Sequence, residues 1–344
     1  MKVSGGVSSF FCLVLGLALL GGVWVSTTAG ASAREQSTPG TLKIAAEQEP
    51  SCMDWIGSCA GAAWGIWAAG IETLPQALTV TPAGDYTPSS VLAGEPILEI
   101  GPPQKITYNI NAAAVWSDNT PITSTDFEYT WKQIATGKDI YDKTGYEDIA
   151  SIDTTDPKVA VVTFSEPFSG WRDLFGGFSF ILPSHLLEGK NRAKIMKDGY
   201  SFSGGPWKLA GGKSGWKKTK SITLVPNQNY WGDKPLIGTV IFQFITESAS
   251  EIQAVKSGQV SSAYPQPQIG ALDQLSENPE LKYEVSFGSV FEALWLNAKA
   301  FPMDSLAVRK SLIYATDRQA IVDEIVKPSV NEGRVLQSFI VPTF

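Results

Sequence analysis

The segment VWSDNTPITSTDFEYTWKQI, residues 115–134, joins a tight turn to an amphipathic helix. The run from Ser117 to Pro121 holds short polar side chains and then a proline, which is typical of a turn. Thr123 is a common N-cap residue, and Asp126 stands three positions later, the spacing of a capping box and a place where an acid stabilises the helix dipole. The segment therefore predicts a turn followed by a helix, and its conspicuous acids have structural roles.

The predicted helix has one apolar face. Phe127, Trp131 and Ile134 fall at positions i, i+4 and i+7, so they face the same side. Such a face must pack against a sheet or another helix. Runs with strand character occur along the chain, and in residues 104–110 Ile106, Tyr108 and Ile110 alternate with polar neighbours. The predicted strands are 41–50, 104–110, 158–168, 220–227 and 239–245.

Helices are predicted between and after these strands. Ser248 and Glu251 have capping-box spacing at the start of SASEIQAVKSG, residues 248–258. Asp317 is predicted to cap a later helix that buries two apolar residues, Ile321 and Ile325. A preceding helix over 305–315 places an apolar stripe on one face, formed by Val308, Leu312 and Ala315. The alternation of strands and helices predicts an α/β or mixed α+β fold.

The N-terminus resembles an export signal. An apolar stretch from about residue 7 to 25 follows Lys2, and Ala31-Ser32-Ala33 matches a signal-peptidase site, so residues 1–33 are a predicted signal peptide cleaved after Ala33. An uncleaved membrane anchor is the alternative, since about 18 apolar residues can span a bilayer. Under both interpretations the body of the protein is exported, to the extracellular space, the periplasm or the cell envelope.

Two cysteines remain after the signal segment. Cys52 and Cys59 lie seven residues apart, and in an oxidising compartment such a pair most simply forms a disulfide. Metal binding is the weaker interpretation, because the chain has one histidine and no further cysteine in its body to complete a tetrahedral site. We therefore expect a disulfide, no metal and no cofactor.

The composition disfavours several classes of function. A formal net charge of −7 argues against nucleic acid or an anionic membrane surface as a partner. The one histidine, His185, lies in the apolar stretch LPSHLL and is expected to be a packed or capping residue rather than a catalytic base. The glycines near residue 212 lack the spacing of a phosphate-binding loop. We expect no enzymatic activity.

Five ordered motifs resemble one protein family. The segment at 115–134 is similar to the W-S-D-G-T-P motif of the extracellular solute-binding proteins of peptide-type ABC importers, which bind oligopeptides, dipeptides or nickel. The resemblance implies a two-lobed fold of the periplasmic-binding-protein type II kind and a monomer that delivers solute to a membrane permease. The other motifs are FILPSHLL (180–187), SGGPWKL (203–209), ITLVPNQNYWGDKP (222–235) and LWLNAKAFPMDSLAVRKSLIYATDRQAI (294–321).

The sequence departs from the family pattern at three points. Asn119 replaces a glycine, and Ser261 stands where an aspartate is common. Family members also continue well past the last motif, so this chain resembles either a fragment of a longer product or a shortened relative. We expect residues 34–265 to form the first lobe with an inserted subdomain, and residues 266–344 to begin a second lobe that is incomplete.

Aromatic residues are candidates for the wall of a binding cleft. They make up 11% of the chain, and Trp55, Trp64 and Trp67 lie beside the cysteine pair. Ligand pockets combine such apolar walls with a few polar groups, although many aromatic residues belong to the core. We take Trp55 as a candidate, and the resemblance implies a ligand-binding tyrosine near Tyr141 or Tyr146.

The resemblance also implies polar ligand contacts. Glu49 corresponds to a cleft-facing acid after the first strand, and Gln266 and Gln268 lie in a segment, AYPQPQIG, that touches ligand between the lobes in relatives. Asn297 is expected to end a strand near the cleft. Arg309 is expected to be buried in a helix and to bridge a carboxylate.

From these observations we expect a binding protein that closes around a peptide and then docks on an ABC permease. A secreted carbohydrate-binding or glycoside-acting protein, with tryptophans as sugar platforms, is an alternative. A fragment without a transport role is another.

Overall fold

The computed structural model describes residues 40–336 except positions 62 and 82 and the segment 286–292. The signal peptide and cleavage site expected in residues 1–33 lie outside this range. Over the part of the chain that the structure describes, no helix has the length and hydropathy needed to cross a bilayer.

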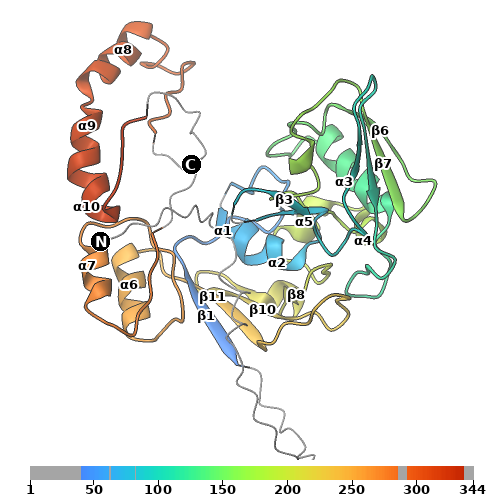
Figure 1. The fold of residues 1–344 in the computed structure, drawn as a ribbon, viewed down its shortest axis with the longest axis horizontal. Coiled ribbons are helices and arrows are strands. Elements are labelled where there is room, and N and C mark those ends of the chain that lie inside the picture. Colours follow the sequence, from blue (N-terminus) through green and yellow to red (C-terminus); the bar gives the residue numbers. More distant parts are fainter. Residues whose placement is uncertain (1–39, 62, 82, 286–292, 337–344) are drawn as a thin grey trace, which may run out of the picture.

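The first sheet is organised around β1 (Thr41–Ala46). It pairs in parallel with β11 (Thr239–Phe244), with Thr41 opposite Thr239. On its other side β1 forms a bridge between Ile44 and Ser262, so the chain comes back to this strand twice. Antiparallel strands complete the sheet in the order β1-β11-β10-β8, with β9 also beside β10: β10 (Ser221–Pro226), β8 (Trp207–Leu209) and β9 (Trp216–Lys217) (Figure 1).

The second sheet is antiparallel, with the order β4-β5-β7-β6. Ile106, Tyr108 and Ile110 are buried, which confirms the predicted alternation. A separate two-stranded sheet joins β2 to β3. The strands are β2 (Leu78–Val80), β3 (Tyr86–Pro88), β4 (Ile97–Glu99), β5 (Lys105–Asn109), β6 (Ile149–Asp153) and β7 (Val159–Phe164).

Helix α3 (Ser124–Thr136) covers the second sheet and contacts β6 and β7. Thr123 and Asp126 form the predicted capping box. Phe127 is fully buried, and its ring lies 5.4 Å from that of Tyr108. Trp131 is half-buried at the edge of the apolar face, where its indole N–H donates to the carbonyl of Tyr146 at 3.0 Å. The prediction from residues 115–134 is therefore confirmed.

Shorter helices connect the two sheets. Before α3 the chain forms α1 (Ala63–Gly65), the π-helical turn η1 (Ile66–Gly70) and α2 (Ile71–Thr73). After β7 come η2 (Trp171–Asp173), α4 (Ser184–Leu187), α5 (Arg192–Met196) and η3 (Gly212–Gly215). Residues from both sheets and from these helices form one hydrophobic core.

A helical column follows the first sheet. It consists of α6 (Ser248–Lys256), α7 (Ala271–Ser276), α8 (Leu306–Ala315), α9 (Arg318–Ile321), η4 (Val322–Val326) and α10 (Lys327–Val330). Helix α6 packs on β1 through Ala254, which together with Val260 contacts Ala45. The helices α8 to α10 stand apart from both sheets (Figure 1), with α10 in contact with α7.

The column departs from the sequence-based expectations in its burial. Leu312, Ile321 and Ile325 are 36%, 44% and 54% exposed, so the prediction that the two isoleucines are buried is wrong. Helices α8 to α10 meet the rest of the described chain mainly at the α10 end, and the apolar stripe of α8 therefore contacts little. The Asp317 cap is confirmed, since its side chain accepts a hydrogen bond from the Ala320 N–H at 3.0 Å.

Three local expectations in this region are also corrected. Ser248 is the first residue of α6, and Glu247 occupies the N-cap without a side-chain hydrogen bond, so no capping box forms. Asn297 does not end a strand, because residues 293–297 have no regular structure. Arg309 is half-buried and donates to the backbone carbonyls of Met303 and Asp304 instead of bridging a carboxylate.

The loop after β1 is held by a disulfide and an ion pair. Cys52 and Cys59 are bonded, which confirms the predicted disulfide. Inside this loop the carboxylate of Asp54, 0% exposed, forms an ion pair with Arg192 of α5, 6% exposed. Burial raises the pKa of Asp54, and the guanidinium of Arg192 acts against that effect. The ion pair therefore makes an ionised Asp54 tolerable in the interior.

We expect the substitution Arg192→Met to destabilise the protein by about 3–5 kcal/mol, because it leaves a buried carboxylate without its partner. The double variant Asp54→Leu/Arg192→Met should regain most of that loss, since no charge stays buried. Urea denaturation measures both. Lys194→Met, on the exposed face of the same helix, is the matched control and should change stability by less than about 0.5 kcal/mol. An Arg192→Met variant within about 1 kcal/mol of the wild type would contradict this role.

Candidate functional site

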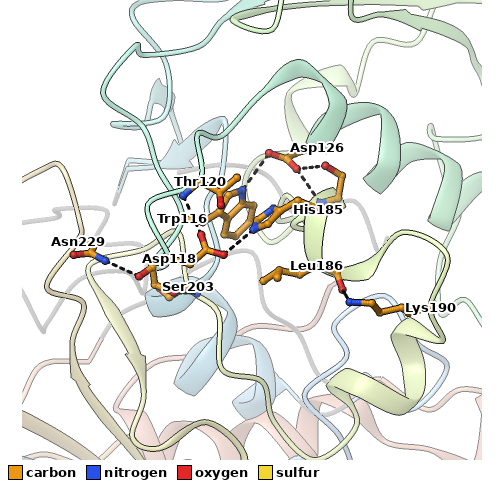
Figure 2. Close-up of polar contacts among 11 residues, drawn as sticks. Trp116, Asp118, Thr120, Asp126, His185, Leu186, Lys190, Ser203 and Asn229 are labelled. Atoms are coloured by element: carbon orange, nitrogen blue, oxygen red, sulfur yellow. Dashed lines mark hydrogen bonds and ion pairs between the residues drawn. The ribbon is translucent and has the colours of Figure 1, made fainter.

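Two acids of the segment 115–134, Asp118 and Asp126, are engaged in structural hydrogen bonds (Figure 2). The carboxylate of Asp126 accepts four of them. Oδ2 accepts from the indole N–H of Trp116 at 3.1 Å and from the N–H of Thr123 at 3.0 Å. Oδ1 accepts from the N–H and hydroxyl of Ser184 at 2.8 and 2.6 Å. Asp126 is 1% exposed, so its lone pairs are used to join the turn, α3 and α4.

His185 lies at the edge of this network. Its Nε2 is 2.9 Å from Oδ2 of Asp118, and its ring centroid is 6.3 Å from that of Trp116 (Figure 2). Burial acts to raise the pKa of Asp118, but hydrogen bonds from His185 and Thr120 outweigh it and hold the pKa below its usual value. The contact of the histidine thus joins α4 to the turn at Asp118, but His185 is exposed, so the packed position expected from the sequence is not found.

We expect Asp126→Asn to cost about 2–4 kcal/mol, because an amide cannot accept all four hydrogen bonds and its NH2 group would face donors. Thermal or urea denaturation measures the loss. Glu128→Gln is the control: Glu128 pairs with Lys132 at 2.6 Å on the exposed side of the same helix, and its loss should cost about 0.5 kcal/mol or less. Equal effects of the two substitutions would contradict the structural role of Asp126.

The carboxyl end of β1 gathers the polar candidates. Glu49 is half-buried, and its Oε1 accepts from the indole N–H of Trp216 at 2.8 Å and from the N–H of Thr219 at 2.9 Å. Glu47, two residues earlier, accepts a hydrogen bond at 2.8 Å from the side-chain amide of Gln266. Gln266 is thus joined to Glu47, whereas the hydrogen bonds of Glu49, two residues further on, go to Trp216 and Thr219.

Aromatic rings lie next to these polar groups. The ring of Trp67 is 5.3 Å from that of Trp64 and 6.2 Å from that of Tyr264. Burial and then the negative charge of Glu47 raise the pKa of Tyr264, which indicates that this tyrosine lies near Glu47. We call the group Glu47, Glu49, Trp67, Tyr264 and Gln266 the strand-end cluster. It lies where the parallel strands β1 and β11 end, the usual place for ligands in open α/β sheets.

Trp55 and Tyr141 belong to a neighbouring loop region. Trp55 is half-buried in the disulfide loop, and its ring makes an edge contact with Phe180 at 5.4 Å. Tyr141 is 64% exposed, and its backbone N–H donates to the carbonyl of Ile56 at 2.9 Å. The loop packs closely on α1: a side chain at position 65 would clash with Pro50, so Gly65 allows this contact. Both aromatic residues are thus attached to the segment that follows Glu49.

Three other candidates lie elsewhere. Tyr146 is 4% exposed, and its hydroxyl accepts from the N–H of Phe175 at 2.9 Å within the core. Gln268 is exposed and donates to the carbonyl of Pro267. Asn297 is exposed and accepts from the N–H of Lys299 in a turn. No hydrogen bond among the described residues joins any of the three to the strand-end cluster.

Sequence reasoning missed two members of the cluster, Glu47 and Tyr264. An acid directly after an apolar strand, two residues before Glu49, was a usable signal for Glu47. Tyr264 stands beside Gln266 in the sequence, but its contact with Trp67 depends on the return of the chain to β1. Among the residues that the structure describes, no group of three or more His, Cys, Asp or Glu could hold a metal ion.

Comparisons with known proteins identify a family. A family model described as the middle region of bacterial extracellular solute-binding proteins, family 5, matches residues 99–344. The oligopeptide-binding protein OppA of Mycobacterium tuberculosis H37Rv is 30% identical over 218 residues, which cover 59% of this chain and 34% of that protein. The probable monoacyl phosphatidylinositol tetramannoside-binding protein LpqW of the same organism is 30% identical over 183 residues, 52% of this chain and 28% of that protein.

Solved structures give the same fold. The periplasmic EDTA-binding protein EppA is similar with a TM-score of 0.73 and 26% identity, over 89% of this chain and 59% of that one. This chain spans less than half of the length of the curated relatives that it matches. The described fold is therefore the first lobe of a type II periplasmic binding protein with part of the second.

Proposed function

This chain belongs to family 5 of the bacterial extracellular solute-binding proteins, and we propose that it binds peptides outside the cytoplasm for an ABC importer. The observation that carries the proposal is the strand-end cluster, in which a carboxylate, a side-chain amide and two aromatic rings meet at the ends of parallel strands. Binding in place of catalysis agrees with the structural engagement of Asp126 and His185.

The chemistry of the cluster suits a peptide. The amide of Gln266 can donate to a peptide carbonyl and accept from a peptide N–H, and Glu47 can pair with an ammonium group. Trp67 and Tyr264 offer apolar surface to side chains. Glu49 shapes the site through its hydrogen bonds to the Trp216 turn. Recognition through the peptide backbone would let the ligand vary in sequence.

The outer contacts extend this proposal. Trp55 lies on the adjoining disulfide loop and Tyr141 is bound to that loop through its backbone, and the two would form a side wall, with Tyr141 the more accessible. Gln268 and Asn297 would approach the ligand from the second lobe when the lobes close. Tyr146 is a core residue, so we assign the tyrosine of the site to Tyr141.

The proposed mechanism is closure of two lobes around the ligand. We place the first lobe at residues 34–265 and the start of the second at residue 266. The crossing segment, defined here as residues 261–270, leaves the edge of β1 and leads to α7. Movement at a few residues of such a segment can close one lobe on the other. The closed monomer would then dock on a membrane permease.

We expect di- to pentapeptides to raise the Tm of the purified protein in a concentration-dependent way, since a ligand at 100 times its Kd adds about 2.7 kcal/mol to the stability of the native state. Gln266→Ala should weaken binding about fivefold through the loss of one hydrogen bond. Gln259→Ala, at an exposed position after α6, is the matched control.

Differential scanning fluorimetry and calorimetric titration measure these effects. A cooperative transition that shifts with oligosaccharides but with no peptide would overturn the proposal in favour of a carbohydrate-binding protein. A broad transition indifferent to every ligand would favour a fragment without a transport role.

A further inference from the structure

Glu251 is a buried acid without a partner. It lies in α6 with 0% of its surface exposed, and neither carboxylate oxygen has a hydrogen-bond partner in the described structure. An ionised carboxylate in such a place is strongly disfavoured unless it is paired, and the usual outcome is that it keeps its proton. Sequence reasoning gave Glu251 a capping role, which the structure does not support.

The charged group that acts on the pKa of Glu251 is another acid, Glu47. Burial raises the pKa of Glu251 to about 7, and the negative charge of Glu47 acts in the same direction. Glu47 follows β1 directly, and α6 packs on β1 through Ala254. The same carboxylate raises the pKa of Tyr264 on the crossing segment. The charge of Glu47 therefore acts on groups of both α6 and the crossing segment, and its side chain contacts the crossing segment at Gln266.

The other ionisable groups of these elements have different surroundings. Lys256, in the last turn of α6, pairs with Glu277 after α7 at 3.8 Å. Glu247 is the N-cap of α6, and Asp273 lies in the first turn of α7. Of these charges, only that of Glu47 contributes to the shift of Glu251. The described residues thus offer Glu251 a like charge and no cation.

Glu47 also holds the crossing segment. The amide of Gln266 donates to its Oε1 at 2.8 Å. Beside this contact the backbone of the segment is tied to β1, because the N–H of Ala45 donates to the carbonyl of Ser262 at 2.9 Å and the N–H of Ser261 donates to that of Lys43 at 2.8 Å. A change at Glu47 is therefore transmitted to the segment that joins the lobes.

We propose that Glu251 and Glu47 form a proton-operated latch on the crossing segment. With Glu251 neutral, Glu47 stays at the end of β1 and holds Gln266. When Glu251 loses its proton, repulsion acts on both carboxylates, and Glu47, which is half-buried, moves towards water because the helix keeps Glu251 in place. The hydrogen bond to Gln266 is then lost, and the crossing segment is released. This inference concerns the segment itself and holds whichever solute binds.

The sign of the pH effect follows from the raised pKa. The unfolded chain loses this proton near the ordinary value of 4.5, whereas the folded protein keeps it until about 7. The stabilising contribution of Glu251 is therefore fully present below 4.5, is lost as the pH rises through this window, and is absent above 7. The latch is closed on the acidic side and open on the alkaline side.

Hydrogen exchange of the crossing segment tests the latch. In the wild-type protein, protection of the amides of residues 261–268, corrected for intrinsic exchange, should fall about tenfold between pH 5.5 and 8.5, with a midpoint near 7. Glu251→Gln cannot lose a proton and should keep its protection at every pH. Glu47→Gln removes the like charge and should shift the titration of Glu251 to lower pH, so it tests the pair even if Glu251→Gln folds poorly.

Glu72 provides the matched control. It is half-exposed on α2, where burial raises its pKa to about 7, and α2 packs against β8. Glu72→Gln should change the pH dependence of the Tm and leave the protection of the crossing segment as in the wild type. Between pH 5.5 and 8, the Tm of the wild type should fall about 5 °C more than that of Glu251→Gln.

Two results would overturn the proposal. One is a wild-type crossing segment whose protection does not change with pH, or changes equally in Glu251→Gln. The other is a protection at pH 8 that depends on added calcium ions and disappears in Glu251→Gln, because the two carboxylates would then hold a cation in place of a proton.

Discussion

The parallel pairing of β1 with β11 is the constraint on which the rest of the structure depends. Thr41 lies opposite Thr239, so the chain between the two strands must leave the sheet and return to it in one register. That excursion contains the whole second sheet, α3 and the disulfide loop. Because parallel strands end on the same side, the return also places the crossing segment beside the residues that follow β1.

The proposed ligand contacts depend on this return. Glu47 and Gln266 come from distant parts of the chain and meet at 2.8 Å because Ser262 bridges to Ile44. The aromatic rings of Trp67 and Tyr264 meet by the same route. In the proposed mechanism a site at this point would combine binding with a hinge, since Gln266 would contact the ligand and also belong to the segment that moves.

Much of the first lobe could be predicted because its signals are local. Thr123 and Asp126 form a capping box within one helical turn, and the alternation of Ile106, Tyr108 and Ile110 reports which face of a strand is buried. Cys52 and Cys59 are close enough in sequence to pair without knowledge of the fold. The helices near the C-terminal end were also predicted correctly. The prediction that Ile321 and Ile325 are buried was wrong, because burial depends on what packs against a helix.

The sequence by itself determined the class of fold, the family, the disulfide and the structural role of the segment 115–134. The disulfide and the role of the segment 115–134 depend on residues a few positions apart, whose geometry the backbone sets, and the fold class and the family follow from the order of such local patterns along the chain. The tertiary structure decided that Tyr146 is a core residue, that Glu47 joins Gln266, and that Glu251 is buried beside a like charge. Burial and long-range contacts depend on how distant segments meet in space, and no local pattern in the sequence reports that.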